Sequence, residues 1–183
     1  MDAYIYIQVQ PGKIPQVMTR LATTPGIRKA VTVVGDWDVL ALIEAPDLLH
    51  IANSILAGIH TVEGILRTNT ALVVPADRVG LAGWGGASSP VPIPNVCFVH
   101  IKAQVGAAAG LVERMADIQD VSGVAVLSGE YDLLACVAQP WEVASGMILE
   151  QIHALPGVES TNTLVSVSYE EPEEDRDQFS TWS

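Results

Sequence analysis

The stretch Val34-Gly35-Asp36-Trp37-Asp38-Val39-Leu40-Ala41 occurs a second time in this chain, in altered form, as Ser128-Gly129-Glu130-Tyr131-Asp132-Leu133-Leu134-Ala135. Gly129 follows Gly35 by 94 residues. A later triplet, Thr68-Asn69-Thr70, returns unchanged as Thr161-Asn162-Thr163, now 93 residues on. A repeat of this length has the size of a small domain, so the sequence predicts two copies of one unit that face each other across a pseudo-twofold axis.

Each copy shows the same order of hydrophobic patterns. Runs rich in β-branched and aromatic residues predict strands, and apolar residues three or four apart predict helices. In the first copy we expect a two-residue hairpin turn at Gly35-Asp36, because glycine accepts positive φ without strain. The order is strand, helix, strand, strand, helix, strand, over residues 4–9, 15–21, 27–34, 37–44, 46–61 and 65–74. This is the ferredoxin-like split motif, an antiparallel sheet with both helices on one face.

The domain organisation follows from the repeat. We expect the first unit over residues 1–75, a linker rich in glycine and proline over 76–95, the second unit over 96–168, and an acidic, disordered tail over 169–183. The uncovered face of each sheet is apolar, and two such faces packed together bury each other. The predicted fold class is therefore α+β, with two ferredoxin-like units forming an intramolecular dimeric α/β-barrel.

Composition excludes several classes of function. Nine lysine and arginine residues oppose 21 aspartate and glutamate residues, and the net charge of −12 opposes direct binding to nucleic acid. Only 16% of the residues are charged, which favours further contacts between chains in a homo-oligomer. Glycine and proline interrupt the longest uncharged run, 79–101, so no membrane span is expected, and without signal-peptide features we expect a cytoplasmic protein. Cys97 and Cys136 lie in apolar runs and are expected to be reduced core residues, with no metal or cofactor.

Four acidic side chains recur at the hairpin. Asp38 and Asp132 begin the third strand of each copy, where a carboxylate either bonds the backbone amides of the turn or holds the ammonium group of a ligand. Asp36 and Glu130, in the turn itself, are either solvated turn acids or binding residues.

Hydroxyl and imidazole groups recur near the last strand. Alternating threonines there are either good strand formers or hydroxyl donors for a carboxylate: Thr68, Thr70, Thr161 and Thr163. His60 and His153 end the second helix of each copy, where a histidine interacts favourably with the helix dipole.

In these motifs, each unit resembles the effector-binding (RAM) domain of the Lrp/AsnC family of transcriptional regulators. The resemblance covers residues 4–74 and 98–167 and includes the turn of glycine, acid, aromatic residue and aspartate. It implies a dimeric α/β-barrel that binds amino-acid-type effectors at contacts between such dimers, near the hairpin turn. It also implies a set of candidate ligand residues: Gly35, Asp36, Trp37, Asp38, Thr68, Thr70, Gly129, Glu130, Tyr131, Asp132, Thr161 and Thr163.

The sequence departs from the full-length regulators because the first predicted strand starts almost at Met1, so we expect no helix-turn-helix domain and no direct DNA binding. The preferred interpretation is a module that binds an amino acid or a related metabolite, oligomerises, and acts on other proteins such as RAM-domain regulators. One alternative is a cofactor-free oxygenase or isomerase of the dimeric α/β-barrel type. His100, with Tyr6 in its place in the first copy, is more consistent with a satisfied core residue. Another alternative is a scaffold without a ligand.

Overall fold

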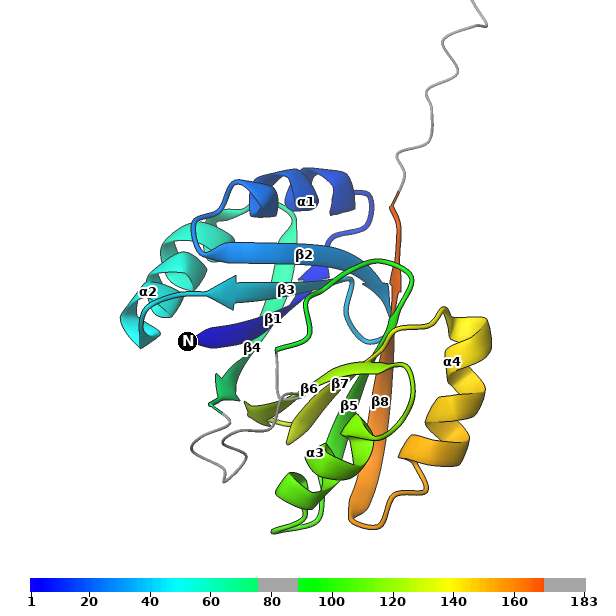
Figure 1. Ribbon diagram of the computed structural model, residues 1–183. Coiled ribbons are helices and arrows are strands. Elements are labelled where there is room, and N and C mark those ends of the chain that lie inside the picture. Colours follow the sequence, from blue (N-terminus) through cyan, green and yellow to red (C-terminus); the bar gives the residue numbers. More distant parts are fainter. Residues whose placement is uncertain (76–88, 170–183) are drawn as a thin grey trace, which may run out of the picture.

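The computed structural model describes residues 1–75 and 89–169, which form two units of similar architecture (Figure 1). The first unit contains β1 (Asp2–Val9), α1 (Ile14–Ala22), β2 (Ile27–Val34), β3 (Val39–Glu44), α2 (Leu48–Asn53) and β4 (Ile65–Val74). The second unit contains β5 (Cys97–Ala103), α3 (Ala108–Ala116), β6 (Val121–Ser128), β7 (Leu133–Val137), α4 (Trp141–Met147) and β8 (Val158–Val167). The predicted order of elements is confirmed in both copies. Most of the predicted linker and nearly all of the predicted tail lie outside the described residues.

The apolar spacing had predicted one regular second helix in each unit. In the structure, neither of these helices is a single regular α-helix. α2 continues as the π-helix η1 (Ser54–Gly58) and the 3-10 turn η2 (Ile59–Thr61), and α4 continues as the π-helix η4 (Ile148–Ile152). In η4 the His153 amide donates to the Ile148 carbonyl five residues earlier, at 2.9 Å. The wider turn leaves Ile148 and Ile152 both buried against the sheet.

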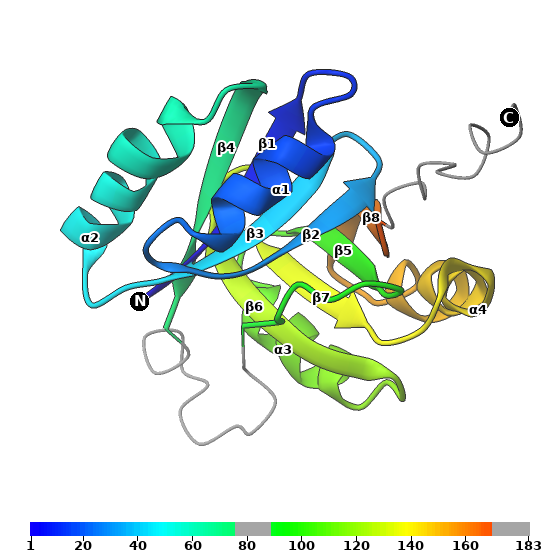
Figure 2. The same cartoon turned by 90° about the horizontal axis from the view of Figure 1, so that it is seen from above.

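The eight strands close into one antiparallel barrel, in the order β1-β3-β2-β8-β5-β7-β6-β4, with β4 pairing back to β1. Two short seams join the units. β2 pairs with β8 from Thr32↔Val167 to Val34↔Val165, and β4 pairs with β6 from Leu72↔Ser128 to Val74↔Val126. The expected intramolecular barrel is therefore confirmed. The view from above shows the two sheets meeting in this way (Figure 2).

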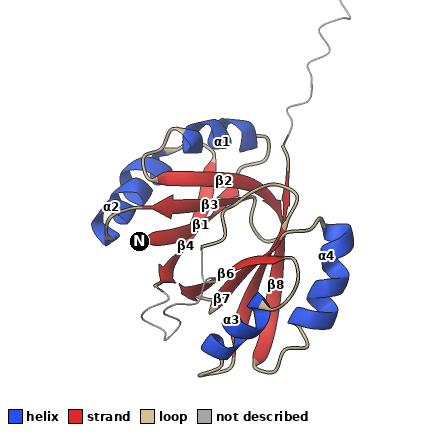
Figure 3. Ribbon diagram, in the orientation of Figure 1, coloured by secondary structure: helices blue, strands red, loops and turns tan. Residues whose placement is uncertain are grey.

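Three hydrophobic cores support the barrel. One lies inside it and combines side chains of both units, including Tyr4, Leu40, Phe98, Leu134 and Leu164. The other two lie between each sheet and its own helices, which cover the outer faces of the barrel (Figure 3). Burial of each large apolar side chain contributes about 1.5–3 kcal/mol, so the shared interior core holds the two units together.

The hairpin between β2 and β3 is longer than the predicted two-residue turn, because β3 begins at Val39 and the connection spans residues 35–38. Residues at or next to the ends of β2 and β3 form hydrogen bonds with other strands of the barrel. Val34 pairs with Val165 across the seam, and the Asp38 amide donates to the Ile7 carbonyl at 3.0 Å. The Val33 amide still donates to the Asp38 carbonyl at 2.9 Å, so only the closing pair beyond it is missing from the hairpin.

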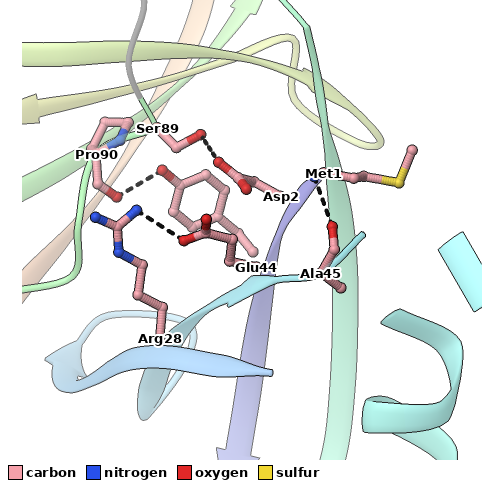
Figure 4. A network of polar contacts seen from close by, with 8 residues as sticks. Met1, Asp2, Arg28, Glu44, Ala45, Ser89 and Pro90 are labelled. Atoms are coloured by element: carbon pink, nitrogen blue, oxygen red, sulfur yellow. Dashed lines mark hydrogen bonds and ion pairs between the residues drawn. The ribbon is translucent and has the colours of Figure 1, made fainter. Parts of the chain in front are cut away.

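A polar network ties the N-terminus to the segment that enters the second unit (Figure 4). The buried Tyr4 hydroxyl donates to the Pro90 carbonyl at 2.7 Å, and the Ser89 hydroxyl donates to the Asp2 carboxylate at 2.6 Å. The N-terminal ammonium group donates to the Ala45 carbonyl at 2.8 Å. Residues 89 and 90 are thus held against the start of β1.

Two further expectations concern the cysteines and the membrane. Cys97 and Cys136 are both buried, which confirms their prediction as core residues. Burial raises the pKa of the Cys97 thiol to about 11. No helix within residues 1–75 and 89–169 has the length and apolar character needed to cross a bilayer.

Substitution by alanine is expected to cost different amounts of stability at the two pseudo-equivalent turn glycines. Gly35 has φ of 147°, and an added Cβ would lie 2.7 Å from Leu164 Cδ2 and 3.3 Å from the Thr163 carbonyl oxygen. Gly129 has no positive φ, and its added Cβ would meet only Ala71, at an ordinary 3.7 Å. We expect Gly35→Ala to lower the free energy of unfolding by about 1–3 kcal/mol, and Gly129→Ala to change it by less than about 1 kcal/mol. Urea denaturation measures both, and equal losses would contradict the seam's role.

Candidate functional site

The centre of the candidate site is a buried contact between two pseudo-equivalent residues. Tyr6 on β1 and His100 on β5 face each other inside the barrel, with 2.8 Å between the tyrosine hydroxyl and His100 Nε2. Their ring centroids lie 5.0 Å apart, and His100 is only 3% exposed. The pseudo-twofold axis therefore passes close to this pair.

The environment keeps both groups uncharged at neutral pH. Burial lowers the pKa of His100 to about 4, although a hydrogen bond with the Asn162 backbone and the charge of Asp36 oppose this shift. Burial also raises the pKa of Tyr6 above its usual range. A phenol that donates to Nε2 requires the imidazole proton to reside on Nδ1. The pair is then a neutral, satisfied hydrogen bond, as the interpretation of His100 as a core residue had predicted.

A cavity of about 550 Å³ opens over this pair, and we call it the axial cavity. Both units contribute to it at equivalent positions of the repeat. It is lined by Tyr6, Asp36, Trp37, Arg67, Thr68, Asn69, His100, Glu130, Tyr131 and Asn162. The symmetry is broken at Arg67, whose place in the second unit is taken by Ser160.

Charged and aromatic groups lie close together in the axial cavity. The Arg67 guanidinium carbon lies 4.6 Å from the centroid of the Trp37 ring, a cation–π contact. The Asn162 amide donates to the Asp36 carboxylate at 2.5 Å, which joins the turn of one unit to the last strand of the other. The ring of Tyr131 lies 4.9 Å from that of His100. One cation and two carboxylates, those of Asp36 and Glu130, are therefore presented to a single space.

Five of the twelve candidate ligand residues line the axial cavity: Asp36, Trp37, Thr68, Glu130 and Tyr131. The other seven lie outside its lining: Gly35, Asp38, Thr70, Gly129, Asp132, Thr161 and Thr163. The two glycines face the seams, where an added Cβ on Gly35 would meet Leu164 and one on Gly129 would meet Ala71. A role of these seven in ligand binding stays a prediction.

Asp38 and Asp132 make the same contact in both units. Oδ2 of Asp38 accepts a hydrogen bond from the Val9 amide, and Oδ2 of Asp132 accepts one from the Ala103 amide, each at 2.8 Å. Both amides lie where the pairing of the first strand with the last strand shifts register. The carboxylates thus bond a backbone amide of the first strand that the irregular ladder leaves free, rather than amides of the turn itself.

The helix-terminal histidines bond the last strand. His60 Nε2 lies 3.0 Å from the Thr68 hydroxyl, and His153 Nε2 makes the equivalent bond with Thr161. The sequence had indicated only an interaction with the helix dipole. These bonds connect the end of each second helix to the strand beneath it.

Sequence reasoning missed several residues that line the axial cavity: Tyr6, Arg67, Asn69, His100 and Asn162. For the two asparagines, the alternation of side chains along a strand could have identified the residue that faces inward. Ala71 and Leu164 belong to the interior core, so Asn69 and Asn162, two residues away, face the same way. The hydroxyls of Thr68 and Thr161, which directly precede the asparagines, instead bond His60 and His153 at the ends of the second helices. The repeated Thr-Asn-Thr triplet therefore marks the asparagine as the inward residue.

A larger hollow of about 690 Å³ lies near the other end of β1. Its wall is mostly aliphatic, and its Arg28 is already paired with Glu44 at 3.2 Å. Pro75 and Ser89 on its rim flank residues 76–88, which lie outside the described part of the chain. We therefore propose no site there, and the axial cavity is the better candidate because its charged groups converge.

Comparison with known proteins supports a family relationship. The sequence profile of the Lrp/AsnC ligand binding domain matches residues 2–76 and 96–176. No curated protein sequence matches the chain. Among solved structures, the siroheme decarboxylase NirDL aligns with 92% of this chain and 71% of its own, at 13% identity and a TM-score of 0.66.

Two further structures resemble parts of the chain. A protein of Thermus thermophilus is 25% identical over 38% of this chain and 86% of its own, with a TM-score of 0.37. AsnC of E. coli is 13% identical over 54% of this chain and 69% of its own, with a TM-score of 0.38.

The aspartate contacts predict a loss of stability. Asp38→Ala leaves the Val9 amide without its acceptor and is expected to lower the free energy of unfolding by about 1–3 kcal/mol, as is Asp132→Ala for Ala103. Glu130→Ala, which removes an exposed acid of the turn, serves as the control and should change stability by less than about 0.5 kcal/mol. Chemical denaturation monitored by circular dichroism provides the values. If both aspartate variants are as stable as the wild type, ligand binding becomes the better explanation for the presence of Asp38 and Asp132 in both copies.

Proposed function

This chain belongs to the Lrp/AsnC ligand binding domain family, and we propose that it is a regulatory module that binds an amino acid or a related small metabolite in the axial cavity. Such a module acts on other proteins, for example regulators with the same domain. The net charge of −12 makes duplex DNA an unfavourable direct partner. A cytoplasmic location is part of the proposal.

One observation carries this proposal: a guanidinium group and carboxylates share one cavity. Arg67 provides the cation, while Asp36 and Glu130 provide the anions. A free amino acid carries a carboxylate and an ammonium group on adjacent atoms, and charged hydrogen bonds to both ends hold it in one orientation. The neutral amides of Asn69 and Asn162 add donors and acceptors for the same polar end.

The family relationship favours ligand binding over catalysis as the function of this cavity. The likeness to siroheme decarboxylase is a likeness of fold, because the identity is only 13%. Tyr6 and His100 bond each other. The proposal gives this pair the role of a rigid floor under the ligand.

Oligomerisation is the second part of the proposal. Large apolar side chains are exposed on the second helices of both units, with Leu49 67%, Leu56 63% and Leu149 62% exposed. Leu56 and Leu149 occupy equivalent positions of the repeat. Exposed apolar side chains on equivalent helices favour burial against further chains.

A thermal-shift screen of the amino acids tests ligand binding. A ligand at a hundredfold excess over its Kd stabilises the folded state by about 2.7 kcal/mol and should raise Tm by roughly 5–10 °C. Arg67→Ala should weaken binding by about ten- to a hundredfold, because it removes the partner of the carboxylate. Arg20→Ala, an exposed arginine on α1, is the control and should bind normally. The proposal fails if no amino acid or related metabolite raises Tm.

Light scattering tests the oligomer. The wild-type protein should have a mass several times the 19.4 kDa of one chain at micromolar concentration. Combined Leu56→Ser and Leu149→Ser changes should lower that mass. Val105→Ser removes an exposed apolar side chain outside the helices and should leave it unchanged. A wild-type mass of 19.4 kDa would refute this part of the proposal.

A further inference from the structure

We propose that the axial cavity binds one basic amino acid per chain, with its α-carboxylate on Arg67, its α-ammonium on Asp36 and its side-chain cation on Glu130. The inference rests on the proposed function of the cavity and narrows its ligand to one class. Three charged residues line the cavity, two acidic and one basic. A basic amino acid carries the complementary set, one negative group and two positive groups.

The other polar groups of the lining do not change this charge balance. His100 is neutral at physiological pH because burial lowers its pKa to about 4, and Tyr6 stays protonated because burial raises its pKa. Asn69 and Asn162 are uncharged amides. A ligand with a second carboxylate would therefore meet Asp36 or Glu130 as a like charge, which costs affinity. A ligand with an apolar side chain would leave one acid without a partner.

The orientation follows from the positions of the charged groups along the chain. Arg67 lies over the ring of Trp37, the residue that directly follows Asp36. Arg67 and Asp36 line the same cavity, and the carboxylate and the ammonium group of an α-amino acid, which would pair with them, lie on adjacent atoms. Glu130 comes from the turn of the other unit, so it is available to a cation at the far end of the ligand.

Both acids are near one aromatic ring. Burial raises the pKa of the Tyr131 hydroxyl, and the charges of Glu130 and Asp36 raise it further. Because Asp36, Glu130 and Tyr131 all line one cavity of about 550 Å³, a single extended ligand can approach both carboxylates. Tyr131 also offers its ring face to the ligand's aliphatic stem or its cation.

The broken symmetry determines the stoichiometry. Each turn brings one acid and one aromatic residue, but Arg67 has no counterpart because Ser160 occupies its position. Among the charged residues that line the cavity, only Arg67 can pair with a carboxylate. One carboxylate partner accommodates one amino acid, although the repeat presents two turns.

Calorimetric titration of the full chain with L-lysine, L-arginine and L-norleucine tests the inference. Lysine and norleucine differ by the ε-ammonium group alone, so they form a matched pair. We expect lysine and arginine to bind with one site per chain, and norleucine to bind about ten- to a hundredfold more weakly, because it cannot use Glu130.

Single substitutions distinguish the role of Glu130 from that of Asp36. Glu130→Gln should reduce the affinity for lysine to that for norleucine and leave norleucine unaffected, whereas Asp36→Asn should weaken both ligands. Glu150→Gln removes an exposed acid on η4 and should change neither affinity. Circular dichroism verifies that each variant is folded, and the affinity ratio of lysine to norleucine remains informative in any variant that is.

The outcomes distinguish this inference from the broader proposal. Equal binding of lysine and norleucine, or binding of another amino acid class alone, would overturn the basic-ligand assignment and leave an amino-acid site in place. Two lysines per chain would overturn the single oriented site. A failure of every amino acid to bind would overturn both proposals together.

Discussion

Two three-residue seams, β2 with β8 and β4 with β6, close the barrel, and the rest of the structure depends on them. Each seam satisfies edge-strand amides and carbonyls that would otherwise face solvent, and closure leaves the barrel without a free edge. The seams also enclose the interior core, in which Tyr4 and Leu40 of one unit pack with Phe98 and Leu134 of the other. Two units in one chain therefore bury their inner apolar faces against each other. Separate copies would have to dimerise to do the same.

The same closure creates the axial cavity. Neither unit alone contains the axial cavity, because its floor is the contact of Tyr6 with His100 and its rim is made by turns from both copies. Duplication within one chain allows the copies to differ at single positions. Arg67 opposite Ser160 is one such difference, and His100 opposite Tyr6 is another. A symmetric homodimer must carry the same residue on both sides, so these differences are possible in a fused chain and not in a homodimer.

Local sequence patterns predicted some elements of this protein correctly and others not. The run of apolar and β-branched residues over 65–74 predicts β4 correctly to the residue, because composition is local information. The hairpin was predicted too short, because the pairing of Val34 with Val165 lies outside any local window. The repeated turn pointed to Asp36, Trp37, Glu130 and Tyr131, which line the axial cavity. Arg67 was missed because it is not repeated, although its lack of a counterpart is what makes it informative.

The sequence by itself determined the two-unit architecture, the order of elements and the paired turns, since repetition and hydrophobic period are written along the chain. It also indicated that His100 is a satisfied core residue. Only the tertiary structure decided what surrounds each side chain. It directs the Asp38 and Asp132 carboxylates to Val9 and Ala103 amides at irregular strand pairs, and it brings the two turns over one cavity. The physical reason is that register shifts and barrel closure are long-range pairings between strands, and they set distances that no spacing along the chain encodes.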